Sequence, residues 1–112
     1  MFFSGGPVFA AENEEIEYLL SHITASDCVF IRNGKEHEAR KASEHLVMKY
    51  SHVKKRIKTA DDFIDKIASQ SSITRRQYGI RCGGVQIPAG QWLRDALELH
   101  RISVKNQQVV RE

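Results

Sequence analysis

Two cysteines, Cys28 and Cys82, have the widest choice of chemistry in this chain. Each is able to act as a nucleophile beside a histidine, to bind a metal ion or to form a disulfide bond. A metal site would need more ligands at short spacing, and the sequence contains neither a CxxC nor an HxxxH motif. A Cys/His nucleophile stays open. If the chain is exported, two lone cysteines in an oxidising compartment most simply pair, so we predict a single disulfide between them.

The histidines suggest a second kind of site. His45 and His52 lie seven residues apart in a helical pattern, which places them about two turns, or roughly 10 Å, from each other. One metal ion cannot bind both as neighbouring ligands, so we expect no metal here. We also expect no other cofactor, because the sequence contains no complete cofactor signature. With Lys49 and Arg56 they form a polar stripe beside the apolar face of the helix. Such a stripe is either a solvated flank or an anion-binding surface, and the sequence leaves both readings open.

The N-terminal segment bears on the compartment. Residues 1–15, MFFSGGPVFAAENEE, contain a short apolar patch, Gly-Gly-Pro and small residues before Ala11. Signal peptidase accepts small residues at such a junction, so we expect cleavage between Ala10 and Ala11 of a signal peptide that lacks its basic segment. The alternative is a disordered leader. Either way, residues 1–10 are set apart from a domain over residues 11–102, and the favoured reading is an exported chain.

Length and composition exclude several classes of protein. The chain has 112 residues, of which 41% are hydrophobic and 28% charged, the balance of one globular domain. No apolar run approaches the roughly 18 residues of a membrane span. The net charge of +3 comes without a dense basic face interleaved with aromatic residues, so no nucleic-acid partner is expected. No internal repeat is evident.

The periodicity of the first half predicts two helices separated by a hairpin. Apolar residues from Ile16 to Ile23 recur on one face of a helix that begins near Glu14 and ends before Asp27. Residues 28–32 form a strand, the pair Asn33-Gly34 favours a type I′ turn, and residues 35–38 return as its partner. A long second helix then begins at Ala39, with an apolar face that continues to residue 57.

The second half predicts two more helices and two short strands. Thr59 is expected to cap a third helix, which ends in a loop with the sequence SQSSITRRQ. Residues 78–82 and 85–87 are predicted strands around Gly83-Gly84, and a fourth helix begins near Pro88. Residues 103–112 lack a clear period and are expected to form a flexible tail. The predicted fold is α+β, with about four helices, a small antiparallel sheet and a single disulfide.

Three motifs follow one another along this pattern. They are FIRNG (Phe30 to Gly34), HLVMK (His45 to Lys49) and RIKTADDFIDKIASQSSIT (Arg56 to Thr74), followed by Tyr78. In this order they resemble a bacterial family of small exported proteins that is classified only as a domain of unknown function. The resemblance covers about Ile16 to Arg101 and implies a periplasmic location, without any catalytic residue. The family pattern has a glycine after SSIT, where this chain has Arg75 and Arg76.

Several polar residues of these motifs have no evident place in a core. Each has a structural explanation, because serines bond to carbonyl groups at a helix end and a tyrosine can pack. Together they would surround one shallow site for an anionic or sugar-like ligand. The candidate ligand-binding residues are Arg32, His45, Lys49, Ser71, Ser72 and Tyr78. We expect the charges of Arg32 and Lys49 to be solvated, so that removing both would cost little stability.

Two functions of different classes agree with these residues. The first is a non-enzymatic binding or interaction module that holds an envelope component or a protein partner. The alternative is a small hydrolase in which His45 acts as the base for a serine of the Ser69–Ser72 segment. The sequence favours the binding module, because no acid stands where it would orient His45 and no nucleophile elbow is present. The oligomeric state and the ligand are not indicated.

Overall fold

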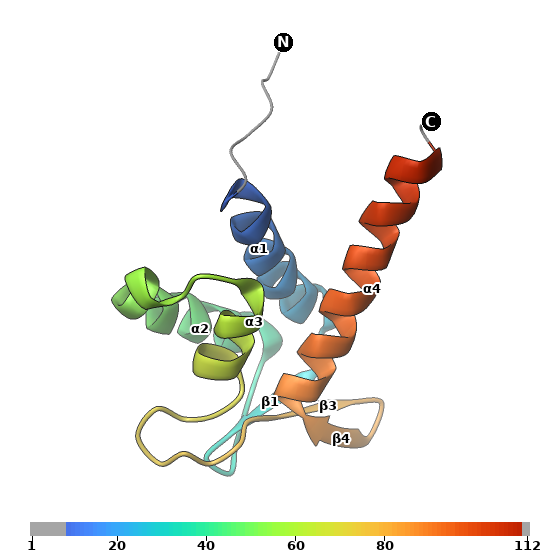
Figure 1. The fold of residues 1–112 in the computed structure, drawn as a ribbon. Coiled ribbons are helices and arrows are strands. Elements are labelled where there is room, and N and C mark those ends of the chain that lie inside the picture. The colour runs from blue at the N-terminus through green and yellow to red at the C-terminus, as the bar shows by residue number, and fades with distance from the viewer. Residues whose placement is uncertain (1–8, 111–112) are drawn as a thin grey trace.

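The computed structural model describes residues 9–110, with side chains described for residues 14–107. Helices cover one face of a four-stranded antiparallel sheet whose strand order is β2-β1-β3-β4 (Figure 1). The elements are α1 (Phe9–Ser26), β1 (Val29–Arg32), β2 (Lys35–His37), α2 (Ala39–Val53), the 3₁₀ turn η1 (Lys54–Arg56), α3 (Ala60–Phe63), the π-helical turn η2 (Ile64–Ala68), β3 (Gly79–Cys82), β4 (Val85–Pro88) and α4 (Ala89–Val110). The predicted α+β class with four helices is confirmed.

Both hairpins turn through two residues with a left-handed backbone. Asn33 and Gly34 have φ angles of 52° and 79°, as a type I′ turn requires, so the sequence-based assignment is confirmed. Gly83 and Gly84 have φ angles of 60° and 87° and connect β3 to β4 in the same manner. These turns fix the register of each hairpin and therefore decide which strand residues face the helices.

The predicted disulfide is confirmed. Strands β1 and β3 pair around Phe30 and Ile80, and just beyond this ladder Cys28 and Cys82 are bonded, with their Cα atoms 4.9 Å apart. The bond joins the first hairpin to the second in the middle of the sheet. Cys28 is therefore part of a cross-link and not a nucleophile.

The two hairpins belong to a structural repeat that the sequence conceals. In both β1-β2-α2 and β3-β4-α4, a tight hairpin leads almost directly into a helix that begins at a buried alanine, Ala39 or Ala89. The units meet through antiparallel pairing of β1 with β3, and this relates them by an approximate two-fold axis. The repeat is one of backbone arrangement, so it does not contradict the absence of a repeat in the sequence. Few residues other than glycine and alanine coincide, so sequence similarity could not reveal the repeat.

Helix α1 packs against α2, α3 and α4, and with the sheet they enclose one hydrophobic core (Figure 1). Its largest fully buried side chains are Tyr78, Phe30, Phe63, Leu19, Ile23, Leu46, Ile64, Ile80, Leu93 and Leu97. Burial of each such side chain contributes about 1.5–3 kcal/mol before the entropy of ordering is subtracted. The core thus fixes the sheet and α2, which carry the candidate site.

Three helix boundaries differ from the sequence-based expectation. Helix α1 begins at Phe9, five positions before Glu14, and α4 continues as a helix to Val110 rather than giving way at residue 103. Helix α2 ends at Val53, where φ is −127°, and η1 carries the chain onward to the buried Ile57. Thr59 caps α3 as predicted, because its hydroxyl accepts a hydrogen bond from the N–H of Asp62 at 3.0 Å.

The N-terminal interpretation lies mostly outside the described residues. Residues 1–8 of the predicted signal remnant or leader are not among them, so the division at residue 10 stays a prediction. Among the described helices, none is both long enough and apolar enough to cross a membrane.

Candidate anion-binding site

Arg32 occupies a strand position that faces the helices. Phe30 is buried on that face, and side chains two residues apart along a strand share a face, so Arg32 points the same way at the end of β1. It is only half-buried, yet no hydrogen bond or ion pair within the described part of the chain involves it. A charged side chain on the core face of a sheet breaks the usual pattern, and such breaks often mark functional positions.

Two histidines lie within the electrostatic reach of Arg32. Burial, together with the positive charge of Arg32, lowers the pKa of both His37 and His45 below the ordinary value. His37 pairs with Phe30 across the hairpin, so it too faces the helices. Its Nε2 atom is buried and has no hydrogen-bond partner among the described residues. Sequence analysis missed His37, although its register opposite Phe30 was a signal that could have found it.

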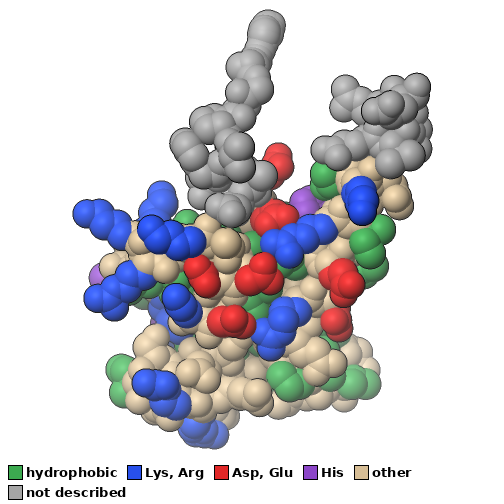
Figure 2. Space-filling view, in the orientation of Figure 1, with side chains coloured by type: hydrophobic (Ala, Val, Ile, Leu, Met, Phe, Trp, Pro, Cys, Tyr) green, Lys and Arg blue, Asp and Glu red, His purple; other side chains and the backbone are tan. Residues whose placement is uncertain are grey.

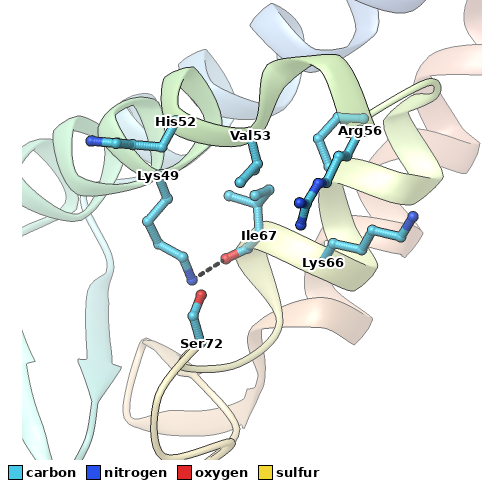
Figure 3. A pocket seen from close by; sticks show the side chains of 8 residues that line it. Lys49, His52, Val53, Arg56, Lys66, Ile67 and Ser72 are labelled. Atoms are coloured by element: carbon cyan, nitrogen blue, oxygen red, sulfur yellow. Dashed lines mark hydrogen bonds between the residues drawn. The ribbon is translucent and has the colours of Figure 1, made fainter.

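Lys49 projects from α2 into the same region, but its ammonium group is already fully bonded. Nζ donates to the carbonyl oxygen of Ile67 at 2.8 Å (Figure 3). It also donates to the carbonyl oxygen of Gln70 at 3.1 Å and to the hydroxyl of Tyr78 at 2.9 Å. Burial and the charge of Arg32 lower the pKa of Lys49 to about 8. Since an ammonium group has three N–H donors, none is left for a ligand. The expectation of a solvated Lys49 was therefore wrong.

Tyr78 links this cluster to the core. Its ring packs on Phe30 with 5.4 Å between ring centroids, and Lys49 Nζ lies 4.8 Å above the Tyr78 ring centroid. The Tyr78 N–H donates to Ser69 and its carbonyl oxygen accepts from Ala89, so the residue ties η2 to α4. Burial raises the pKa of the hydroxyl, which stays protonated.

The two candidate serines have different surroundings. Ser71 is buried, and its hydroxyl oxygen accepts hydrogen bonds from the N–H groups of Ile73 and Thr74, which fold the loop on itself. Ser72 is exposed and lines a pocket beside Lys49 (Figure 3). The structure thus gives Ser71 a role in shaping the loop and leaves the Ser72 side chain accessible.

The loop containing Arg75 closes tightly despite the missing glycine. Arg75 has a left-handed backbone with φ of 65°, the conformation that favours glycine, and its N–H donates to the Ser71 carbonyl at 3.0 Å. Thr74 then donates its hydroxyl proton to Asn33 Oδ1 at 2.7 Å. This bond holds the loop against the hairpin turn next to Arg32.

The structure therefore brings Arg32, His45, Lys49 and Tyr78 together, adds His37, and places Ser72 on the far side of Lys49. All four basic members lack a carboxylate partner among the described residues, and no metal-binding group of acidic, histidine and cysteine side chains occurs there. The arrangement is suited to an anion rather than to a cation.

Nothing in the site supports the hydrolase alternative. The Ser69 hydroxyl donates to the Ile64 carbonyl at 2.6 Å, and no hydrogen bond connects a serine to His45 within the described chain. A serine nucleophile needs such a contact with its base, even if it is loose in the free enzyme.

Comparison with known proteins identifies the family of this chain. The family of unknown function DUF5329 matches residues 10–101, most of the chain. The chain belongs to this family. The uncharacterised protein YfeK of Salmonella typhimurium strain LT2 is 42% identical over 72 residues, which cover 63% of this chain and 60% of YfeK. No solved structure gives a significant match. The expected membership of a bacterial family of unknown function is confirmed, and the DUF5329 family brings no assigned activity to the site.

Proposed function

We propose that this protein is an exported, non-enzymatic binding module that holds an anionic group of an envelope component or of a protein partner. The observation that carries the proposal is the position of Arg32. Its guanidinium lies on the core face of the sheet, close enough to His37, His45 and Lys49 to lower the pKa of each. A cluster of like charge is unfavourable in the free protein, and a bound anion would relieve it.

The roles within the cluster follow from the hydrogen bonds already made. Arg32 has five N–H donors in a planar fork that suits a carboxylate or a phosphate, and the described residues use none of them. His37 and His45 can donate to the same anion. Lys49 contributes its positive charge, but its three N–H groups donate to Ile67, Gln70 and Tyr78. It therefore supports the site without contacting the anion directly.

Export is supported by two features. The Cys28–Cys82 disulfide is typical of an oxidising compartment, and the family pattern implies the periplasm. Intact-mass measurement on periplasmic material, before and after reduction and alkylation, tests this part of the proposal. Retention of the protein in the cytoplasmic fraction with two alkylated thiols would contradict it.

The binding role is tested with immobilised protein and an envelope extract. We compare the wild type with Arg32→Gln and with Arg40→Gln, a matched loss of one arginine at an exposed position of α2. Material retained by the wild type and by Arg40→Gln, but lost from Arg32→Gln, supports the proposal, and retention should weaken as salt rises. Equal retention by all three proteins would refute it.

A further inference from the structure

The pocket beside Lys49 that Ser72 lines has an apolar inner wall. It lies between the end of α2, η1 and η2 and has a volume of about 350 Å³. Val53, Ile57 and Ile67 form its inner wall, and Figure 3 shows the Val53 and Ile67 side chains pointing toward each other. The volume falls within the range of about 300–1,000 Å³ that is typical of small-molecule pockets.

Cationic side chains surround this wall. Lys49, His52, Arg56 and Lys66 line the pocket together with Ser72. Figure 2 shows Lys and Arg side chains gathered over the same part of the molecule, the end of α2 and the turn after it. A pocket with hydrocarbon inside and positive charge at its mouth is complementary to a molecule that is apolar at one end and anionic at the other.

The cationic residues that line the pocket differ in how available their side chains are for a ligand. The Nδ1–H group of His52 donates to the Met48 carbonyl oxygen at 2.8 Å, and the ring points away from the pocket in Figure 3. Lys66 lies 4.0 Å from Asp62, whereas the described ion pairs do not include Arg56. The Arg56 guanidinium points into the space beside Ile67 (Figure 3). Arg56 and Ser72 are therefore the groups best placed to hold a head group.

We infer that this pocket binds an anionic amphiphile with a single hydrocarbon chain. The chain lies against Val53, Ile57 and Ile67, and the carboxylate or phosphate head group lies at Arg56 and Ser72. An extended peptide fits less well, because its backbone needs partners and the nearby groups are in use. The Ile67 carbonyl accepts from Lys49, and the Ile57 N–H donates to the Lys54 carbonyl. The inference does not depend on Arg32, His37 or His45, none of which lines the pocket, although Lys49 borders both sites.

The test uses dodecanoate below its critical micelle concentration as the probe, with calorimetry for affinity and NMR for location. We expect dodecanoate to shift the methyl signals of Val53, Ile57 and Ile67. Arg56→Ala should weaken binding about tenfold, as the loss of a charge-assisted hydrogen bond does. Lys55→Ala removes an equal charge from the same exposed turn without lining the pocket, and should bind like the wild type.

Further ligands and variants separate the contribution of the charged head group from that of the hydrocarbon chain. The neutral dodecyl maltoside and the chainless acetate should both bind more weakly than dodecanoate. Val53→Phe fills the pocket and should favour shorter acids, and Arg32→Gln should leave dodecanoate binding unchanged even if it abolishes the proposed function. Equal losses in Arg56→Ala and Lys55→Ala, absence of methyl shifts, or tighter binding of an acidic peptide than of dodecanoate would each overturn the inference.

Discussion

Gly90 lies so close to Ser69 that a β-carbon at position 90 would stand 2.5 Å from the Ser69 hydroxyl oxygen and 3.2 Å from its Cβ atom. The contact joins the start of α4 to the end of η2, next to the bond between Tyr78 and Ala89. Glycine is required here for close approach and not for its backbone freedom.

Gly90→Ala should lower the free energy of unfolding by about 1–3 kcal/mol, because the added methyl group forces α4 away from η2. Urea denaturation measures the loss, with Gln91→Ala as an exposed control in the same turn. Ser69→Gly removes both clashing atoms, so Gly90→Ala should cost much less in that background. An equal cost in both backgrounds would mean that Ser69 is not the obstacle.

Arg75→Gly should stabilise the protein by up to about 1 kcal/mol. A left-handed backbone costs a non-glycine residue about 1–2 kcal/mol, and the greater freedom of glycine in the unfolded chain offsets part of the gain. Arg76→Gly removes the same charge from the next position, whose φ is not positive, and should not stabilise. If thermal unfolding showed the same change for both variants, charge rather than backbone would be the cause.

Lys49→Met should destabilise the fold by about 1–3 kcal/mol. The variant keeps most of the side-chain stem but leaves the Ile67 and Gln70 carbonyls and the Tyr78 hydroxyl without their donor. Lys41→Met, at an exposed position of the same helix, serves as the control in chemical denaturation. A Lys49→Met protein as stable as Lys41→Met would show that the three bonds contribute nothing net.

Stability should fall as the pH falls from about 7 toward 5. Burial lowers the pKa of His22, His37 and His45 in the fold below 6.5, so the unfolded chain binds protons first. Their contribution is complete above pH 6.5 and is lost as the pH drops through the folded-state pKa values. Denaturation at several pH values measures this slope, which should be shallower in the double variant His37→Gln and His45→Gln. An unchanged slope in that variant would exclude the cluster as its source.

Binding should respond to pH in the opposite direction. Protonation of His37 or His45 adds positive charge beside Arg32, so capture of an anion by the cluster should strengthen as the pH falls toward 5. The retention experiment with the envelope extract, repeated across this range, measures the effect. Weaker capture at low pH would indicate that the neutral histidines accept hydrogen bonds from the ligand.

The elements of the fold were predictable where local chemistry decides them. Asn33-Gly34 and Gly83-Gly84 specify tight turns through their own backbone preferences, and Thr59 specifies a helix start through its hydroxyl. The end of α2 was not predictable in the same way. The apolar pattern continues from Val53 to Ile57 at helical spacing. Only the structure shows that the chain leaves the α-helix at Val53, where η2 packs against α2.

The candidate site was partly predictable for a related reason. The sequence identified several polar residues that lay outside the expected core. Four of them lie in one region of the structure: Arg32, His45, Lys49 and Tyr78. Their individual roles depend on three-dimensional distances to residues elsewhere in the chain, and spacing in the sequence does not reveal these distances. The three donors of Lys49 are taken up by two backbone carbonyls about twenty residues away and by the Tyr78 hydroxyl. His37 enters the cluster only through the register of the hairpin.

The two ββα units share a backbone arrangement but carry different side chains at the positions of the cationic cluster. Aligning the two hairpin turns in the sequence pairs Arg32 with Cys82, His37 with Ile87 and His45 with Asp95. Half of the approximate dyad therefore carries the cationic cluster, while the equivalent half carries a cross-link, an apolar side chain and an acid. A ligand that recognises the cluster therefore has one binding site per chain. Titration should saturate at one ligand per chain rather than two.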